Sequence, residues 1–175
     1  SPPGVTERSL LAMPEITIGL YPDVGATYFL NQMPTGCGLF LGLTGAHMNA
    51  TDALFLKLAD HFVASSSYAE ILSGLQAIQW GDTAALNHQK VTDLLNQISA
   101  RDGSQRPESQ VEAHLPLIQK LTSGSDIETV VSAILSNTDE HPWLVRARTT
   151  LAGGCPITAH IVWNQLQHGP DHTCR

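Results

Sequence analysis

The sequence contains little positive charge and no apolar run long enough to cross a membrane. It has nine lysine and arginine residues against sixteen aspartate and glutamate residues, for a formal net charge of −7 at pH 7. The basic residues form no stripe that could follow a phosphate backbone, so no nucleic-acid partner is expected. The longest apolar stretches, such as Cys37 to Leu43, fall far short of the roughly 20 residues of a membrane span. We therefore expect no membrane partner either.

Cysteine is also scarce. The three cysteines, Cys37, Cys155 and Cys174, are an odd number at wide spacing, and no Cys or His pair has the spacing of zinc ligands. We therefore expect reduced thiols and no metal site. The first eight residues lack the order of charged and apolar segments that a signal peptide needs, and this favours a cytoplasmic protein. If a segment before Ser1 carries a transit peptide, the expected location is the mitochondrion.

Glycine, proline and helical periodicity are unevenly distributed along the chain. The first 62 residues are rich in glycine and proline and carry only two basic residues, Arg8 and Lys57. The remainder is polar and has the apolar spacing of amphipathic helices. We therefore predict two regions, residues 1–63 and residues 64–175, with the second almost entirely helical.

The pattern predicts the individual elements as follows. In the first region we expect a strand over 8–13, helices over 24–33, 39–43 and 51–58, and a return strand over 61–63. In the second region we expect helices over 68–78, 91–98, 111–121, 127–134, 142–152 and 156–167, and an exposed loop over 101–110. Ser125 and Glu128 have the spacing of a capping box before the fourth of these helices.

Two acidic residues in the first region are candidates for chemistry. Glu15 follows Pro14 at the end of the predicted strand, and Asp23 follows Pro22 at the predicted helix start. A carboxylate with fixed geometry in apolar surroundings can act as a base or a nucleophile. The residues between them would form an apolar wall, so that both carboxylates could face one cleft; these residues are Ile16, Ile18 and Leu20.

Both carboxylates also have a purely structural explanation. Glutamate is usually exposed, so Glu15 could be a solvated turn residue. Asp23 could serve as the N-cap of the following helix. None of the eight histidines pairs with serine or cysteine in a nucleophile motif, so we expect no catalytic histidine. Cys37 has no neighbouring base and is expected to be a small buried thiol.

Two long runs, ERSLLAMPEITIGLYPDVGATYFLNQM and GLFLGLTGAHMNATDALFLKLADHFV, resemble the enoyl-CoA hydratase/isomerase (crotonase) superfamily. Asp23 stands where other members have glycine, and this favours the 3-hydroxyisobutyryl-CoA hydrolase branch. The resemblance weakens over 64–140 and returns at WLVRARTTLAGGCPITAHIVWNQL. It implies an α/β crotonase-like fold, a ββα superhelix, of which this chain would hold a mostly helical part with a few short strands. Residues 1–63 would then be the C-terminal part of the core, and residues 64–175 an insertion followed by assembly or lid helices.

The resemblance implies hydrolysis of a short branched 3-hydroxyacyl-CoA thioester. The expected reaction converts 3-hydroxyisobutyryl-CoA to 3-hydroxyisobutyrate and coenzyme A, as in valine catabolism. Glu15 matches the glutamate that activates water or attacks the acyl carbonyl, and Asp23 matches the aspartate that contacts the hydroxyacyl group. Both are therefore expected to be catalytic and substrate-binding. No metal or separate cofactor is implied, because coenzyme A is part of the substrate. The expected partner is that acyl-CoA, and a homo-oligomer is possible.

The resemblance also predicts that the chain holds only half of an active site. The backbone N–H groups of the oxyanion hole and most of the coenzyme A site would precede Ser1, and relatives would continue beyond Arg175. We therefore expect no hydrolysis by the 175 residues alone. Two alternatives stay open, namely an enoyl-CoA hydratase or isomerase, and an inactive truncated fragment that serves only assembly. The chain departs from the family at Ala26, where a second glycine is usual, and at Cys155, where serine is frequent.

Overall fold

The computed structural model describes residues 3–23 and 25–168 and divides the chain into two compact units. The first unit takes its residues from Ser1–Leu10 and Asn49–Ser109, and the second from Leu11–Met48 and Gln110–Arg175. Each unit therefore combines two segments that are separated in the sequence. The predicted division at residue 63 concerns which residues form the crotonase core, and it stays a prediction.

The first unit contains a short parallel strand pair and a capped helix. Strand β1 (Gly4–Val5) pairs with β2 (His61–Phe62), and this confirms the predicted return strand. Helix α3 (Ala50–Phe55) begins with a capping box, in which the side chains of Asn49 and Asp52 each accept a hydrogen bond from the other residue's backbone N–H.

The strand predicted over 8–13 is wrong. Only Leu11 forms a β-bridge, which pairs it with Met48 in the second unit. A turn at Thr6, whose carbonyl accepts from the Ser9 N–H, interrupts the extended backbone before this bridge, and Pro14 ends it afterwards. The apolar run is therefore too short to form a ladder.

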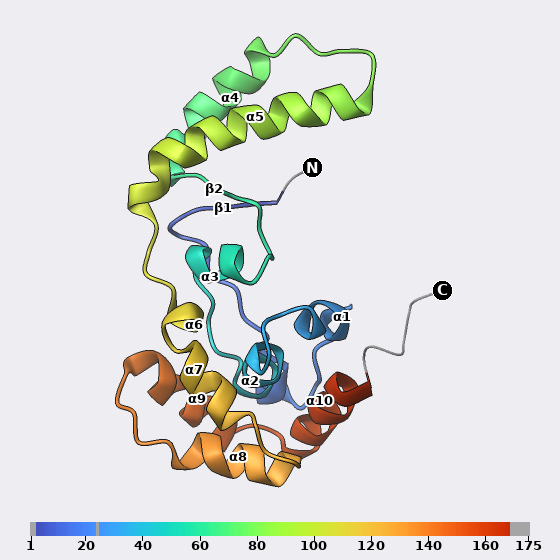
Figure 1. The fold of residues 1–175 in the computed structure, drawn as a ribbon, viewed down its shortest axis with the longest axis vertical. Coiled ribbons are helices and arrows are strands. Elements are labelled where there is room, and N and C mark those ends of the chain that lie inside the picture. The colour runs from blue at the N-terminus through green and yellow to red at the C-terminus, as the bar shows by residue number, and fades with distance from the viewer. Residues whose placement is uncertain (1–2, 24, 169–175) are drawn as a thin grey trace. The chain divides into compact units, whose positions relative to one another are not determined.

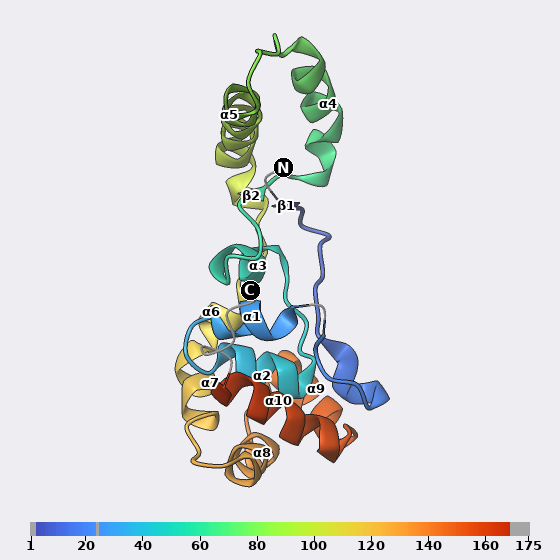
Figure 2. The same ribbon diagram turned by 90° about the vertical axis from the view of Figure 1, so that its right-hand side faces the viewer.

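A helical hairpin forms the larger part of the first unit. After a 3₁₀ turn, η2 (Ser65–Ser67), helix α4 (Tyr68–Ala77) lies beside α5 (Ala84–Asp102), as Figures 1 and 2 both show. Helix α5 begins before and ends after the predicted 91–98, so the predicted loop over 101–110 is wrong at its start. A second 3₁₀ turn, η3 (Gly103–Gln105), follows it. Within the described chain, α4 has no fully buried residue, because its apolar face is covered only in part by α5.

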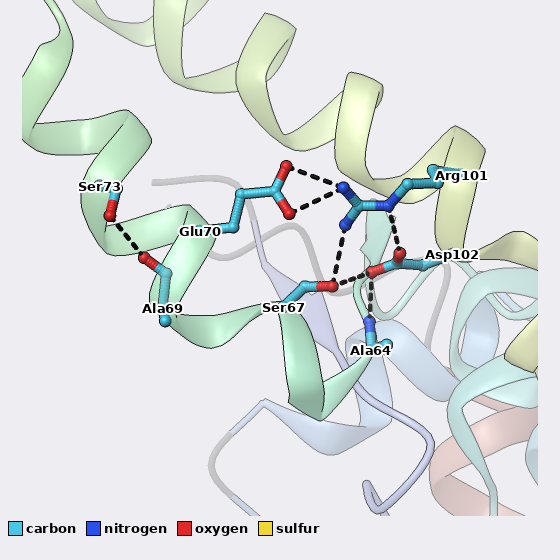
Figure 3. A network of polar contacts seen from close by, with 7 residues as sticks. All are labelled: Ala64, Ser67, Ala69, Glu70, Ser73, Arg101 and Asp102. Atoms are coloured by element: carbon cyan, nitrogen blue, oxygen red, sulfur yellow. Dashed lines mark hydrogen bonds and ion pairs between the residues drawn. The ribbon is translucent and has the colours of Figure 1, made fainter.

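A buried carboxylate ties the two ends of this hairpin together (Figure 3). Asp102 is 2% exposed and accepts hydrogen bonds from the Ala64 N–H (2.8 Å), the Ser67 hydroxyl (2.6 Å) and the Arg101 Nε (3.0 Å). Arg101 also pairs with both carboxylate oxygens of Glu70. Burial raises the pKa of Asp102, but the three hydrogen bonds outweigh this effect and hold the pKa below its ordinary value. The network fixes the end of α5 against the start of α4.

The second unit is built around a helix that is apolar on every side. All eight residues of α2 (Cys37–Thr44) are buried, as expected for a helix without a polar face. It contacts helices on several sides (Figures 1 and 2). These are α1 (Ala26–Asn31), α7 (Leu115–Leu121), α9 (Pro142–Ala152) and α10 (Pro156–His168). Helix α2 ends at Gly45, which has a φ of 57°, as the sequence predicted.

The remaining helices of this unit differ from the predictions at their ends, and one predicted helix is divided. The helix predicted over 111–121 is divided into α6 (Gln110–Ala113) and α7, with Pro116 in the first turn of α7. Helix α8 (Ile127–Ser136) is capped by Asp126, whose carboxylate accepts from the Thr129 N–H at 2.8 Å. The predicted capping box of Ser125 and Glu128 is therefore wrong, and the cap is a single bond to the side chain of Asp126. Helices α9 and α10 confirm the predictions over 142–152 and 156–167.

No helix within residues 3–23 and 25–168 is long and apolar enough to cross a membrane. In the same part of the chain, no three histidine, cysteine, aspartate or glutamate side chains are grouped so that they could hold a metal ion.

Candidate active site

Glu15 lies on a short 3₁₀ helix whose backbone is well fixed. This helix, η1 (Pro14–Ile18), begins with a proline, and the Thr17 hydroxyl donates to the Pro14 carbonyl at 2.6 Å. The carbonyl of Glu15 accepts from the N–H of Leu20 at 3.1 Å, and Gly19 ends the helix with a φ of 75°. These bonds hold the Glu15 backbone at one orientation.

Contacts on two sides hold η1 against the rest of the second unit. Ile16 is 1% exposed, and its carbonyl accepts from the Cys155 N–H at 3.0 Å. On another side, Gly45 approaches the start of η1 closely, since a Cβ atom at this glycine would lie 3.1 Å from the Met13 carbonyl oxygen and 3.3 Å from Pro14 Cα. Ile16, the residue after Glu15, is therefore anchored in the core.

The side chain of Glu15 is half-buried, and one of its oxygens lacks a partner. Its Oε2 is inaccessible to solvent, and no group in the described part of the chain donates a hydrogen bond to it. Leaving a buried acceptor unpaired costs roughly 1–3 kcal/mol, and more for a charged group. An unpaired carboxylate oxygen in a rigid turn is rare in folded proteins and calls for an explanation such as a catalytic role. The solvated turn that we considered for Glu15 does not describe this environment.

Asp23 has different surroundings. Its side chain is exposed, and its backbone carbonyl accepts from the Ala26 N–H at 2.8 Å. The N-cap of α1 is Gly25, with a φ of 81° and no side-chain capping bond. The predicted N-cap role of Asp23 is therefore wrong, and the helix begins later than expected. Val24, the predicted first residue of that helix, lies outside the described residues.

The three residues of the predicted apolar wall between the two carboxylates do not share one environment. Ile16 points into the core, whereas Ile18 and Leu20 are 70% and 55% exposed. The three residues therefore do not form a single apolar wall, because one is buried and two face solvent. That the two carboxylates share one cleft stays a prediction.

Among the described residues of the second unit, cavities are found that neither Glu15 nor Asp23 lines. A cavity of about 360 Å³ lies among the ends of α1, α7 and α10 beside α2. A second cavity of about 240 Å³ lies beside Ile16, between α8, α9 and α10, and is mostly apolar. Its polar lining includes His160 and Glu128, whose Nε2 and Oε1 atoms are 3.8 Å apart.

Cys37 and Cys155, the cysteines among the described residues, are free thiols in opposite environments. Cys37 is buried within α2, as predicted, and burial raises the pKa of its thiol to about 11. Cys155 precedes Pro156 at the start of α10, where the backbone N–H and the hydroxyl of Thr158 lower the pKa of its thiol. Sequence analysis missed this environment, for which the Cys-Pro step before a predicted helix was the signal. Cys174 lies outside the described residues.

Comparison with known proteins identifies the family of this chain. Residues 5–175 match the enoyl-CoA hydratase/isomerase family. The chain is 31% identical over 165 residues to the mitochondrial 3-hydroxyisobutyryl-CoA hydrolase of Xenopus tropicalis, covering 94% of this chain and 41% of the frog protein. It is 30% identical over 167 residues to 3-hydroxyisobutyryl-CoA hydrolase 1 of Arabidopsis thaliana, covering 94% and 42%.

Solved structures share the same fold. An enoyl-CoA hydratase from Rhodobacter sphaeroides superimposes with a TM-score of 0.69 at 27% identity, covering 94% of this chain and 42% of that one. A carnitinyl-CoA dehydratase from Mycobacterium thermoresistibile gives a TM-score of 0.76 at 25% identity, covering 97% and 45%.

The chain therefore belongs to the enoyl-CoA hydratase/isomerase family and has part of the crotonase fold, mostly helical with short strands, as the sequence predicted. Within this family it resembles the 3-hydroxyisobutyryl-CoA hydrolase branch. It spans about two fifths of the length of these curated relatives.

The names of the relatives also bear on location. The frog relative is named as mitochondrial, and so is a mouse relative that is 30% identical over 169 residues, covering 96% of this chain and 42% of the mouse protein. These names agree with the mitochondrial alternative that depends on a preceding transit peptide. They give no support to the cytoplasmic expectation.

Proposed function

We propose that this chain supplies the carboxylate side of a crotonase-type active site that hydrolyses a short branched 3-hydroxyacyl-CoA thioester. The leading substrate is 3-hydroxyisobutyryl-CoA, which the frog relative's name specifies. One observation carries the proposal. Glu15 is fixed on a rigid turn and has a buried carboxylate oxygen to which no described group donates.

The reaction consumes only water besides the thioester, and a carboxylate serves as its base or nucleophile. Glu15 either removes a proton from water, which then attacks the thioester carbon, or attacks that carbon itself to form an anhydride that water hydrolyses. In both routes the C–S bond breaks, coenzyme A leaves as the thiol after gaining a proton, and the free acid forms. The family's two oxyanion-hole N–H groups would stabilise the charge on the carbonyl oxygen. Neither route requires a metal or a redox cofactor.

Asp23 would recognise the substrate hydroxyl. Its exposed carboxylate is not used to cap α1 and can accept a hydrogen bond from a bound molecule. An uncharged glycine at this position, as in other family members, would lack that acceptor. We therefore assign Asp23 to substrate binding and Glu15 to the reacting centre.

The rest of the active site, the pathway and the location are proposed from the relatives. The preceding part of the fold would provide the oxyanion donors and most of the coenzyme A site, and the product acid would belong to valine catabolism. We place the activity in the mitochondrion, in line with the names of the frog and mouse relatives. Self-association of the helical region is a further part of the proposal.

A chimera tests the proposed reaction. The part of the frog hydrolase that precedes its matched region is joined to Val5 of this chain, which completes the core. We expect thiol release from 3-hydroxyisobutyryl-CoA, reduced by about 10- to 100-fold in Asp23→Gly, the loss expected for one hydrogen bond to a charged group. Circular dichroism should show no change, because Gly25 and not Asp23 caps α1.

The outcomes of this test separate the alternatives. Hydration of an enoyl-CoA without thiol release would replace the hydrolase proposal by a hydratase. Enoyl-CoA hydration must be measured beside thiol release, because the enoyl-CoA hydratase from Rhodobacter sphaeroides shares this fold with a TM-score of 0.69. A folded chimera with neither activity would favour a fragment that serves only assembly.

A further inference from the structure

We propose that the loop between α9 and α10 positions Glu15, and that Gly154 is the positioning residue. The loop acts through Ile16, the neighbour of Glu15 on η1. The catalytic consequence rests on the proposed function, whereas the mechanical link between the loop and Glu15 does not.

Gly154 is required for space. A Cβ atom built there would lie 2.9 Å from Ile16 Cγ1 and 3.1 Å from its Cδ1, and 3.2 Å from the Leu151 carbonyl oxygen. Carbon atoms in contact are normally about 3.5–4.0 Å apart. Because Ile16 is 1% exposed, its side chain cannot turn away into solvent. The backbone of Gly154 has no positive φ, so a substitution there acts through the contacts with Ile16 and with the Leu151 carbonyl oxygen and not through backbone strain.

A hydrogen bond connects the same loop to the backbone of η1. The Cys155 N–H donates to the Ile16 carbonyl at 3.0 Å. The loop therefore holds both the side chain and the carbonyl of Ile16. The close approach of Gly45 to Met13 and Pro14 limits how far η1 can move as a body. Part of a displacement of the Ile16 side chain can enter the cavity of about 240 Å³ that Ile16 and Gly154 both line. The part that reaches the Ile16 backbone is taken up within the short turn, where Glu15 is the adjacent residue.

The neighbouring glycine provides a matched control. A Cβ atom at Gly153 would meet only the carbonyl oxygens of Thr149 at 3.7 Å and Thr150 at 4.0 Å, which is ordinary contact. The φ of Gly153 is −91°, which any residue adopts. Gly153→Ala thus adds the same methyl group to the same loop without touching Ile16.

The test compares Gly154→Ala with Gly153→Ala in the 175-residue chain. The carbon-13 resonance of the Glu15 carboxyl, assigned by its loss in Glu15→Gln, reports the surroundings of this group. We expect Gly154→Ala to shift this resonance and to raise the hydrogen-exchange rate of the Cys155 amide at least about tenfold, in line with the local opening that a weakened bond allows. Gly153→Ala should do neither.

A second comparison identifies the contact itself. Ile16→Ala removes both carbon atoms that a methyl group at position 154 would strike. If the contact transmits the effect, Gly154→Ala should shift the Glu15 resonance no further once Ile16 is truncated. A shift of the same size in both backgrounds would overturn the proposal.

Turnover in the chimera gives the catalytic readout. We expect Gly154→Ala to lower kcat by roughly 10- to 100-fold with KM unchanged, the loss expected for a reacting group misplaced by about 1 Å or less. Absence of hydrolysis by the wild-type chimera would count against the proposed function, and the Glu15 resonance would still decide the positioning role. A lower Tm with an unmoved resonance and normal kcat would make Gly154 merely structural and overturn the proposal.

Discussion

Glu15 and Asp23 are near one another in the sequence but suit different tasks. The half-buried Glu15 is held on a turn that is bonded into the core, whereas Asp23 is exposed beside the start of α1. A reacting group gains most from fixed geometry, because little of the reaction barrier is then spent on orientation. A group that only recognises a substrate hydroxyl can remain accessible. The division of roles that we propose for the two carboxylates rests on this difference.

At the residue scale, Asp102 should make the stability of the first unit depend on pH. An aspartate whose pKa is depressed in the folded protein stabilises the fold above its unfolded pKa, and this effect is lost as the pH falls through the folded pKa. The ordinary value is 3.8. We expect Asp102→Asn to lower the free energy of unfolding by roughly 1–3 kcal/mol at neutral pH. The difference from wild type should shrink below about pH 4.

Urea denaturation across this pH range measures the difference. Glu70→Gln is the matched control, because it removes charge from the exposed end of the same network while leaving the bonds from Ala64 and Ser67 to Asp102. Exposed ion pairs contribute little to stability, so this variant should unfold almost as wild type does. A difference between Asp102→Asn and wild type that did not depend on pH would contradict the role assigned to the charge of Asp102.

At the element scale, the packing of α1 on α2 depends on Gly38. A Cβ atom there would lie 2.2 Å from the carbonyl oxygen of Leu30, so the two helices would have to separate. Alanine normally stabilises a helix interior by about 1 kcal/mol over glycine. We expect the opposite here, with Gly38→Ala destabilising the second unit by about 1–3 kcal/mol through overpacking.

Thermal unfolding followed by circular dichroism tests this expectation. Gly153→Ala serves as the control within the same unit, since its added methyl group makes only ordinary contacts. Equal melting temperatures for Gly38→Ala and Gly153→Ala would show that the close approach of α1 and α2 is not needed for stability.

The bounds of the helices and strands show how much of the fold the sequence could predict. Helices α9 and α10 begin with prolines and are separated by two glycines, so local signals alone define their bounds. The strand over 8–13 and the cap at Asp23 were predicted wrongly because local turn geometry decided both. Sequence patterns cannot show which of several suitable residues a turn will use.

The sequence proposes the residues of the candidate site, and their roles stay a prediction. Glu15 and Asp23 stood out as acidic residues after prolines, and the family resemblance gave them roles. The contact of Gly154 with Ile16 joins residues far apart in the chain and depends on the packing of α9 and α10 against η1. No single-sequence signal reports such a contact.

At the scale of the whole molecule, this chain corresponds to about two fifths of each curated relative. A crotonase-type hydrolase needs oxyanion donors opposite its carboxylate, and we assign those donors to the part of the fold that precedes the matched region. The chimera with the frog hydrolase supplies that part and leaves Glu15 in its own surroundings. It therefore isolates the contribution of this chain to catalysis.

Thiol release from 3-hydroxyisobutyryl-CoA by the chimera, with and without Glu15→Gln, is the most direct test of the role of Glu15. Glutamine keeps the size of the side chain but cannot act as base or nucleophile. We expect turnover to fall by at least about 100-fold, the lower end for loss of a positioned acid or base, while the fold and substrate binding are retained. Near-normal hydrolysis by a folded Glu15→Gln chimera would contradict the assignment of Glu15 as the reacting carboxylate.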